Sequence, residues 1–321
     1  MQDKLIIDRY QVITDNSRLK EVKNLRILSD FHVGRRTLRN KGKRAFAPIL
    51  EYFDNQSDID AVLIPGDHVN RASSFVNKDV MNQLCLVLSE IVERVPNTPV
   101  ILSMGNHDKY RQTPETLEAY KSLGDIKNVY PLDNEKIEFK GVVYAGFSPR
   151  HTAYRLLAHG VIANRMTVKD FHASGLTFDP NQLNILLNHA PHLMSNKHAL
   201  CELKEIYEAL TLIVSGHLHN GGISDDFEQN ILSKFKWLQD KGRWPSIKTG
   251  FVNNMSRGGF VLSDKREFVS FPTRGEEALI NLSDERAALL VSKGVNRAYH
   301  PPSVTEVTIK PMRLTKKLKT N

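Results

Sequence analysis

Cysteine is scarce and long apolar runs are missing, and each shortage counts against a class of protein. Only two cysteines, Cys85 and Cys201, occur among 321 residues, which argues against a disulfide framework or a structural zinc site. Both lie in stretches with helical periodicity, so we expect buried free thiols in a reducing compartment. A run of about 18 apolar residues, as a transmembrane helix needs, does not occur. Residues 1–10 carry charge and lack the apolar core of a signal peptide, so we expect a cytoplasmic protein.

Blocks of basic and aromatic residues are also missing, although the chain is basic. The net charge of +8 favours an anionic partner: a phosphorylated metabolite, nucleic acid or an acidic membrane surface. Residues 313–319 form only a short basic stretch, which we expect to be a solvated chain end. No linker, repeat or low-complexity segment is evident. We therefore expect one domain over residues 1–310, followed by a basic C-terminal tail over residues 311–321.

Short apolar runs alternate with helical periodicity along the first part of the chain. We expect strands at residues 4–14, 25–29, 61–64, 99–102, 136–139, 142–147, 183–187, 211–214, 260–262, 267–271 and 303–309. Helices are expected at residues 45–53, 79–95, 114–123, 199–210 and 227–241. Residues 148–180 have no clear pattern. Early strand–helix alternation followed by several strands predicts a layered α/β domain.

Five of the expected strands end in residues that can bind metal ions. After these strands come Asp30 and His32, Asp67, Asn106 and His107, His189, and finally His217 and His219. A single Asp or His after a strand usually caps or solvates a loop. Five such groups indicate an active site instead, because α/β sheets bind ligands at the carboxyl ends of their strands. Carboxylates, imidazoles and one amide, without thiolate, suit divalent manganese, iron or zinc.

These strand-end residues belong to five short blocks of sequence. They are Ser29-Asp30-Phe31-His32, Gly66-Asp67, Gly105-Asn106-His107-Asp108, Asn188-His189 and Gly216-His217-Leu218-His219. In this order, the blocks resemble those of the calcineurin-like metallophosphoesterase superfamily, and the resemblance spans residues 25–220. It implies an α/β fold, a four-layer α/β/β/α sandwich. Residues 255–259 and 301–305 are similar to the end of bacterial YkuE-like phosphoesterases, although the loop after His219 departs from that group's pattern.

The resemblance also implies a site for two divalent metal ions. Carried over position by position, one ion would be held by Asp30, His32 and His219, and the other by Asn106, His189 and His217. Asp67 would bridge both ions. Such a site hydrolyses a phosphodiester, phosphomonoester or pyrophosphate by in-line attack of a metal-bridging hydroxide. We therefore expect a phosphoric ester hydrolase with an anionic phosphate-ester substrate.

Two further residues of the Gly-Asn-His-Asp block are expected to be catalytic. His107 follows a ligand and so projects differently, which places it to protonate the leaving oxygen or stabilise the transition state. Asp108 is expected to orient the His107 imidazole, as a carboxylate does behind a catalytic histidine. A simple turn cap is the alternative for Asp108.

Substrate contacts are less well specified by the sequence. Arg71 resembles the phosphate-contacting arginine of protein phosphatases, and a surface ion pair is its alternative role. Arg35 and Arg150 lie in loops expected near the sheet edge, where they could bind an anionic group. Asn70 stands where many relatives carry an acid, which removes a charge beside the site.

Other functions remain open from the sequence. A metal-dependent nuclease fits the positive charge, but without a nucleic-acid-binding module or an aromatic-basic platform it is not favoured. A non-catalytic interaction scaffold would fit a superfamily member that had lost metal ligands, whereas here every expected ligand is present. Peripheral contact with an anionic membrane through the basic tail is a third alternative.

Overall fold

The structure is a computed structural model, and it describes residues 5–14, 19–34, 42–149, 168–190, 201–216, 259–262, 268–271, 278–281, 287–291 and 302–311. Within these ranges the strands form two mixed sheets of seven strands each. The first sheet has the order β12 (Ala278–Asn281), β1 (Ile6–Thr14), β14 (Ser303–Pro311), β2 (Lys23–Ile27), β3 (Ala61–Pro65), β4 (Val100–Ser103) and β5 (Val129–Leu132). The second has the order β11 (Phe268–Phe271), β10 (Gly259–Leu262), β13 (Ala288–Val291), β9 (Leu212–Ser215), β8 (Leu183–Asn188), β7 (Val142–Phe147) and β6 (Glu135–Phe139).

The strands that lead to the described motif residues run parallel to one another within each sheet. In the first sheet, β2, β3, β4 and β5 run parallel, and in the second sheet β7, β8 and β9 do so. Antiparallel pairs occur elsewhere, between β14 and β2 and between β10 and β11. Because neighbouring parallel strands end at the same sheet edge, β2, β3, β4, β8 and β9 bring their following residues together.

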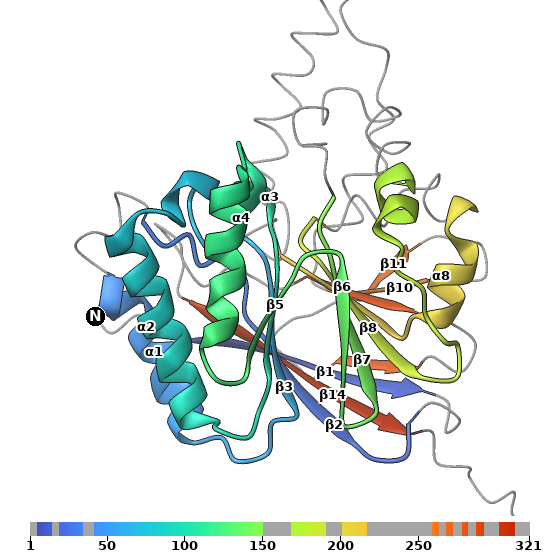
Figure 1. The fold of residues 1–321 in the computed structure, drawn as a ribbon. Coiled ribbons are helices and arrows are strands. Elements are labelled where there is room, and N and C mark those ends of the chain that lie inside the picture. The colour runs from blue at the N-terminus through green and yellow to red at the C-terminus, as the bar shows by residue number, and fades with distance from the viewer. Residues whose placement is uncertain are drawn as a thin grey trace, which may run out of the picture.

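The sheets pack face to face, and helices cover both outer faces (Figure 1). α1 (Gly42–Asp54), α2 (Lys78–Arg94) and α4 (Pro114–Lys121) lie over the first sheet, and α8 (Lys204–Ala209) and the helix at 168–174 lie over the second. The side chains of β3 alternate accordingly: Ala61 and Leu63 point into the core between the sheets, whereas Val62 and Ile64 face the helices. This arrangement confirms the predicted four-layer α/β/β/α sandwich.

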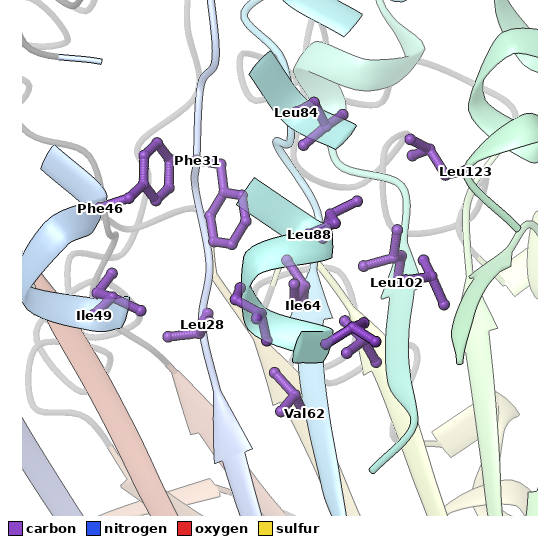
Figure 2. Packing of buried hydrophobic residues seen from close by; sticks show 14 of the residues in the cluster. Leu28, Phe31, Phe46, Ile49, Val62, Ile64, Leu84, Leu88, Leu102 and Leu123 are labelled. Carbon is purple, nitrogen blue, oxygen red and sulfur yellow. The ribbon is translucent and has the colours of Figure 1, made fainter. Parts of the chain in front are cut away.

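Helix α2 illustrates how the sequence determines one of these layers. The Asn77 side chain caps its first turn by accepting hydrogen bonds from the backbone N–H groups of Asp79 and Val80. Leu84 and Leu88, one turn apart, are fully buried against the strand residues of the first sheet (Figure 2). Burying this apolar stripe stabilises the helix more than its intrinsic propensity does.

Most predicted elements in the described ranges are confirmed, but three strands were missed and one expected helix is interrupted. The missed strands are β5, β12 and β13. β5 contains Pro131, which breaks a strand pattern but is tolerated because β5 lies at the edge of its sheet. In the described part of the helix expected at 199–210, a turn at Leu203 interrupts the helix ahead of α8 (Lys204–Ala209). The helix expected at 227–241 and the tail after Pro311 lie outside the described residues.

The expectation that both cysteines are buried is wrong. Cys85 is half-buried in α2, but Cys201 is exposed because the short helical turn that carries it, ahead of α8, faces solvent. Both are free thiols, as expected. Among the described residues, no helix is long and apolar enough to cross a membrane.

Candidate active site

The loops that leave β2 and β3 run side by side beyond the first sheet. The backbone N–H groups of His32 and Val33 donate to the carbonyl groups of Asp67 and His68, both at 2.9 Å, and Val33 and Val69 form an isolated parallel bridge. Asp30, His32 and Asp67 have φ angles of 57°, 44° and 54°, in the left-handed region that non-glycine residues rarely adopt. Backbone strain of this kind is concentrated at functional sites, where the surrounding structure must enforce it.

Five of the side chains predicted for the site converge at this edge. The Asp67 Oδ2 atom lies 3.2 Å from His189 Nε2 and 3.6 Å from His32 Nε2, and Asp30 Oδ1 lies 3.9 Å from His32 Nε2. The fifth, His107, is half-buried, and its ring meets the His32 ring edge-on with centroids 4.7 Å apart. The other four residues are almost completely buried.

These ligand atoms form two overlapping groups that could each hold a metal ion. One group is His32, Asp67 and His107, and the other is Asp30, Asp67 and His189, with all ligand atoms within 4.8 Å of one another in each. Asp67 belongs to both groups. Oxygen and imidazole nitrogen ligands without sulfur suit borderline divalent cations, so the donor set fits the ions expected from the sequence.

The electrostatics of the site without metal differ between its two buried imidazoles. Burial lowers the pKa of His32, and the nearby His107 and His189 act in the same direction, against the attraction of Asp67 and Asp30. Burial also disfavours a charged His189, but attraction and hydrogen bonding by Asp67, supported by Asp30 and the Pro65 carbonyl, raise its pKa to about 9. The His189 Nδ1 atom lies 2.7 Å from that carbonyl, so Nδ1 carries a proton and Nε2 faces Asp67.

His107 is held by contacts with the turn that contains Asp67. Its backbone N–H donates to Asp67 Oδ1 at 2.8 Å, and its ring Nδ1 lies 2.7 Å from the Asn70 carbonyl oxygen. A carbonyl oxygen only accepts, so Nδ1 carries the proton in this contact. Nε2 is therefore free to exchange a proton with a molecule bound in the site. It is the Asn70 backbone, not its side chain, that meets His107.

The expected role of Asp108 is corrected by the structure. Its carboxylate does not contact His107: Oδ2 accepts from Gly105 N at 2.8 Å and lies 2.8 Å from His68 Nδ1, and Oδ1 accepts from Val69 N at 3.1 Å. Asp108 is fully buried, because α3 (Asn106–Lys109) directs it inward while His107 points toward His32. A carboxylate surrounded by these donors holds the turn together and does not orient the His107 imidazole.

Close backbone packing at the site depends on glycine at three strand ends. A Cβ atom added to Gly105 would collide with the Asp67 backbone nitrogen and carboxylate, and one on Gly66 would lie 2.8 Å from His189 Nδ1. A Cβ atom on Gly216 would strike the Ser29 hydroxyl and come within 2.7 Å of Asp30 Oδ2. Side chains at these positions would occupy the space in which the ligands converge.

The remaining predicted residues are placed only in part. Asn106 begins α3 beside His107 and is half-buried. Arg71 is exposed at the start of the short 3-10 helix η2 (Ala72–Ser74), and it forms no ion pair with any residue that the structure describes. The predicted ligands His217 and His219 and the predicted substrate contacts Arg35 and Arg150 lie outside the described residues.

Sequence reasoning missed two residues beside the site. One is His68, which is fully buried against Asp108. Lys109, at the end of α3, donates from its ammonium group to Asp133 Oδ1 at 3.1 Å and to the Ser148 carbonyl at 2.8 Å. It thereby ties α3 to the end of β7 in the second sheet. The only local signal for either residue was its position next to a motif residue.

The profile of the calcineurin-like phosphoesterase family matches residues 24–221, more than half of the chain. The chain belongs to this family. Membership implies metal-dependent hydrolysis of phosphate esters and binding of divalent metal ions, as the oxygen and imidazole ligand groups also suggest. The narrower similarity to YkuE-like phosphoesterases stays a prediction.

Two solved structures that match the chain do so at low sequence identity. The Pseudomonas putida nuclease MPE is 13% identical, with a TM-score of 0.29 and 61% of each chain covered. A protein of unknown function from Aquifex aeolicus is 15% identical, with a TM-score of 0.26, covering 61% of this chain and 80% of the other. The chain thus spans about 61% of the nuclease's length. No curated protein matches the chain.

Proposed function

We propose that the chain is a phosphoesterase that uses two divalent metal ions and His107 to hydrolyse an anionic phosphate ester. The observation that carries this proposal is the position of Asp67, whose Oδ2 atom lies 3.6 Å from His32 Nε2 and 3.2 Å from His189 Nε2, between ligands assigned to different ions. Two cations held close together need an anion between them, and Asp67 is placed to be that anion. His217 and His219 complete the proposed ligand set by their position in the family's last motif.

Divalent ions in such a site supply an activated water and neutralise the charge that develops on the phosphate. The protein's own residues have two tasks around them. Asp30, His32, Asp67, Asn106 and His189 would hold the ions, and the burial of all of them except Asn106 excludes bulk water from the ligand atoms. His107 is oriented by the Asn70 carbonyl so that its Nε2 atom can protonate the departing oxygen.

The substrate class follows from charge and from the family. A phosphodiester, phosphomonoester or pyrophosphate fits both the net charge of +8 and a site that acts on phosphate esters. A nuclease is a narrower version of the same chemistry. Assaying the manganese-loaded protein against mono- and diesters, nucleotides and nucleic acid separates these substrates, and the preferred one will show the highest kcat/KM.

Replacing Asp67 tests the metal site directly. Asp67→Ala is expected to abolish metal-dependent hydrolysis of an aryl phosphate ester, because both proposed ions lose the ligand that they share. Asp125→Ala is the matched control: Asp125 is exposed in the 3-10 helix η3 (Ser122–Asp125), which precedes β5 and so lies at the edge of the first sheet opposite the site. Full activity in Asp67→Ala would refute the proposal.

Replacing His107 tests the proton donor. His107→Asn keeps an amide N–H where Nδ1 donates to the Asn70 carbonyl but removes Nε2. We expect metal affinity to be retained while kcat falls most for esters with poor leaving groups. Equal losses for good and poor leaving groups would argue against proton donation. Retained kcat would exclude any catalytic role of the His107 ring.

The location and domain organisation stay predictions from the sequence. We infer a cytoplasmic protein with one domain over residues 1–310. Membrane contact through the basic tail would appear as salt-sensitive binding to anionic vesicles that is lost when residues 313–321 are removed. Binding that is indifferent to salt would exclude it.

A further inference from the structure

A fully buried histidine, His68, lies beside the candidate metal ligands without being one of them. It follows Asp67 directly and has no exposed surface. Its Nδ1 atom lies 2.8 Å from Asp108 Oδ2, and its ring packs against the buried Tyr120 ring with centroids 5.8 Å apart. Its Nε2 atom makes no hydrogen bond with the part of the chain that the structure describes. Burying an imidazole costs free energy unless it is hydrogen-bonded, so the contact with Asp108 offsets part of that cost.

That contact completes a set of donors around Asp108 from two different turns. Gly105 N, His68 N and His68 Nδ1 converge on Oδ2 at 2.8, 3.3 and 2.8 Å, and Val69 N donates to Oδ1 at 3.1 Å. Gly105 belongs to the turn after β4, whereas His68 and Val69 belong to the turn after β3. The Asp108 carboxylate therefore joins the two turns.

Hydrogen bonds between the two turns run in both directions. The turn after β4 returns two contacts to the turn after β3: His107 N donates to Asp67 Oδ1 at 2.8 Å, and His107 Nδ1 lies 2.7 Å from the Asn70 carbonyl. Three of the proposed functional residues, Asp67, Asn106 and His107, lie on these two turns. Their positions relative to one another thus depend on how the turns are held together.

Among the donors to Asp108 that the structure describes, His68 Nδ1 is the only one supplied by a side chain. The backbone N–H groups would be present with any residue at position 68. Both Asp108 oxygens accept from backbone N–H groups, Oδ2 from Gly105 and His68 and Oδ1 from Val69, as the oxygens of an ionised carboxylate do. An ionised carboxylate accepts only, so His68 Nδ1 carries the proton that joins them.

We propose that His68 is a positioning residue that, through Asp108, fixes the turn carrying Asn106 and His107 against the turn carrying Asp67. This inference rests on the proposed function, since those three residues are its ligands and proton donor. It assigns His68 no contact with the substrate or the ions. Groups behind metal ligands typically change metal affinity or activity about 10- to 100-fold when removed.

Three substitutions separate the hydrogen bond from simple occupancy of the space. His68→Asn places an amide N–H close to the position of Nδ1 and so keeps a donor to Asp108. His68→Gln places its amide near the position of Nε2, away from Asp108, and His68→Leu removes every donor while filling the space. His172→Leu, at an exposed histidine in the helix at 168–174, is the control for loss of an imidazole.

We expect His68→Leu and His68→Gln to lower both manganese affinity, measured by calorimetry, and kcat by about 10- to 100-fold, with a smaller change in KM. The loss of kcat should be larger for poor leaving groups, because His107 is displaced. His68→Asn should recover most of both quantities, and His172→Leu should match the wild type. The wild type should also show a downfield proton resonance from His68 Nδ1 that all three His68 variants lack.

Two results would overturn the proposal. One is a His68→Leu protein with a lower melting temperature but wild-type kcat and manganese affinity in its folded fraction. The other is a His68→Asn protein whose kcat and manganese affinity are as low as those of His68→Gln. This second comparison tests the proposal even if His68→Leu does not fold. If the wild type hydrolyses no phosphate ester, the proposed function fails. The positioning role of His68 is then still tested by whether the wild type and His68→Asn bind manganese more tightly than His68→Gln and His68→Leu.

Discussion

Replacing Gly105 with alanine is expected to disable the site while leaving the fold intact. Gly105 has φ −93° and ψ −177°, extended backbone that alanine adopts without strain. The whole effect must therefore come from the added Cβ atom. That atom would collide with the Asp67 backbone nitrogen and Oδ1 and lie 2.9 Å from Asp67 Cγ, where ordinary contacts begin at 3.4 Å.

The expected magnitude follows from the displacement needed to relieve this contact. Gly105 and Asp67 must separate by roughly 1 Å, and misplacing reacting groups by that distance can cost about 100-fold in rate. Overpacking of this kind also destabilises by about 1–3 kcal/mol, which lowers the melting temperature by roughly 2–10 °C. We expect activity to fall far more than stability, because Asp67 and Asn106 lie on opposite sides of the contact.

The assay compares hydrolysis of an aryl phosphate ester, manganese affinity and thermal melting in one set of variants. Gly124→Ala is the matched control: its Cβ atom would lie 3.4 Å from Pro131 Cδ, an ordinary contact at the far side of the first sheet. It should behave like the wild type in all three measurements. A Gly105→Ala protein with wild-type kcat and manganese affinity would show that the close approach of the two turns is not needed for function.

Three further predictions concern stability and reactivity. Leu88→Ala, in the buried face of α2 (Figure 2), should lower the free energy of unfolding by about 2–5 kcal/mol, whereas Leu86→Ala, 42% exposed on the same helix, should change it little in a denaturant titration. Burial raises the pKa of the Cys85 thiol, so Cys201 should react first with an alkylating reagent, and the opposite order by mass spectrometry would contradict the described exposures. In the metal-free protein the pKa of His189 is raised from 6.5 to about 9, so its contribution to stability is complete below pH 6.5 and lost as the pH rises through 9. Melting temperatures after chelation should therefore fall between pH 7 and 9, and a rise would contradict the pairing with Asp67.

The strands and the motif residues at their ends could be predicted because they depend on local sequence. The apolar run Ala61–Ile64 is buried on both faces of a strand, and a run of this kind has few other stable environments. The direction of parallel strands then brings the residues that follow them to one edge. β5 was missed because its proline is acceptable only at a sheet edge, and edge position is a property of the assembled sheet.

The amino-acid sequence by itself determined the layered fold, the types of metal-binding group and their convergence at one edge, because periodicity and strand direction act over short stretches of chain. Tertiary structure alone decided which partner each polar side chain meets. Asp108 and His107 are neighbours in the chain, yet one points inward to His68 and the other toward His32. Sequence adjacency does not specify such choices, because they depend on how the turns after β3 and β4 pack and on the direction in which α3 projects each residue.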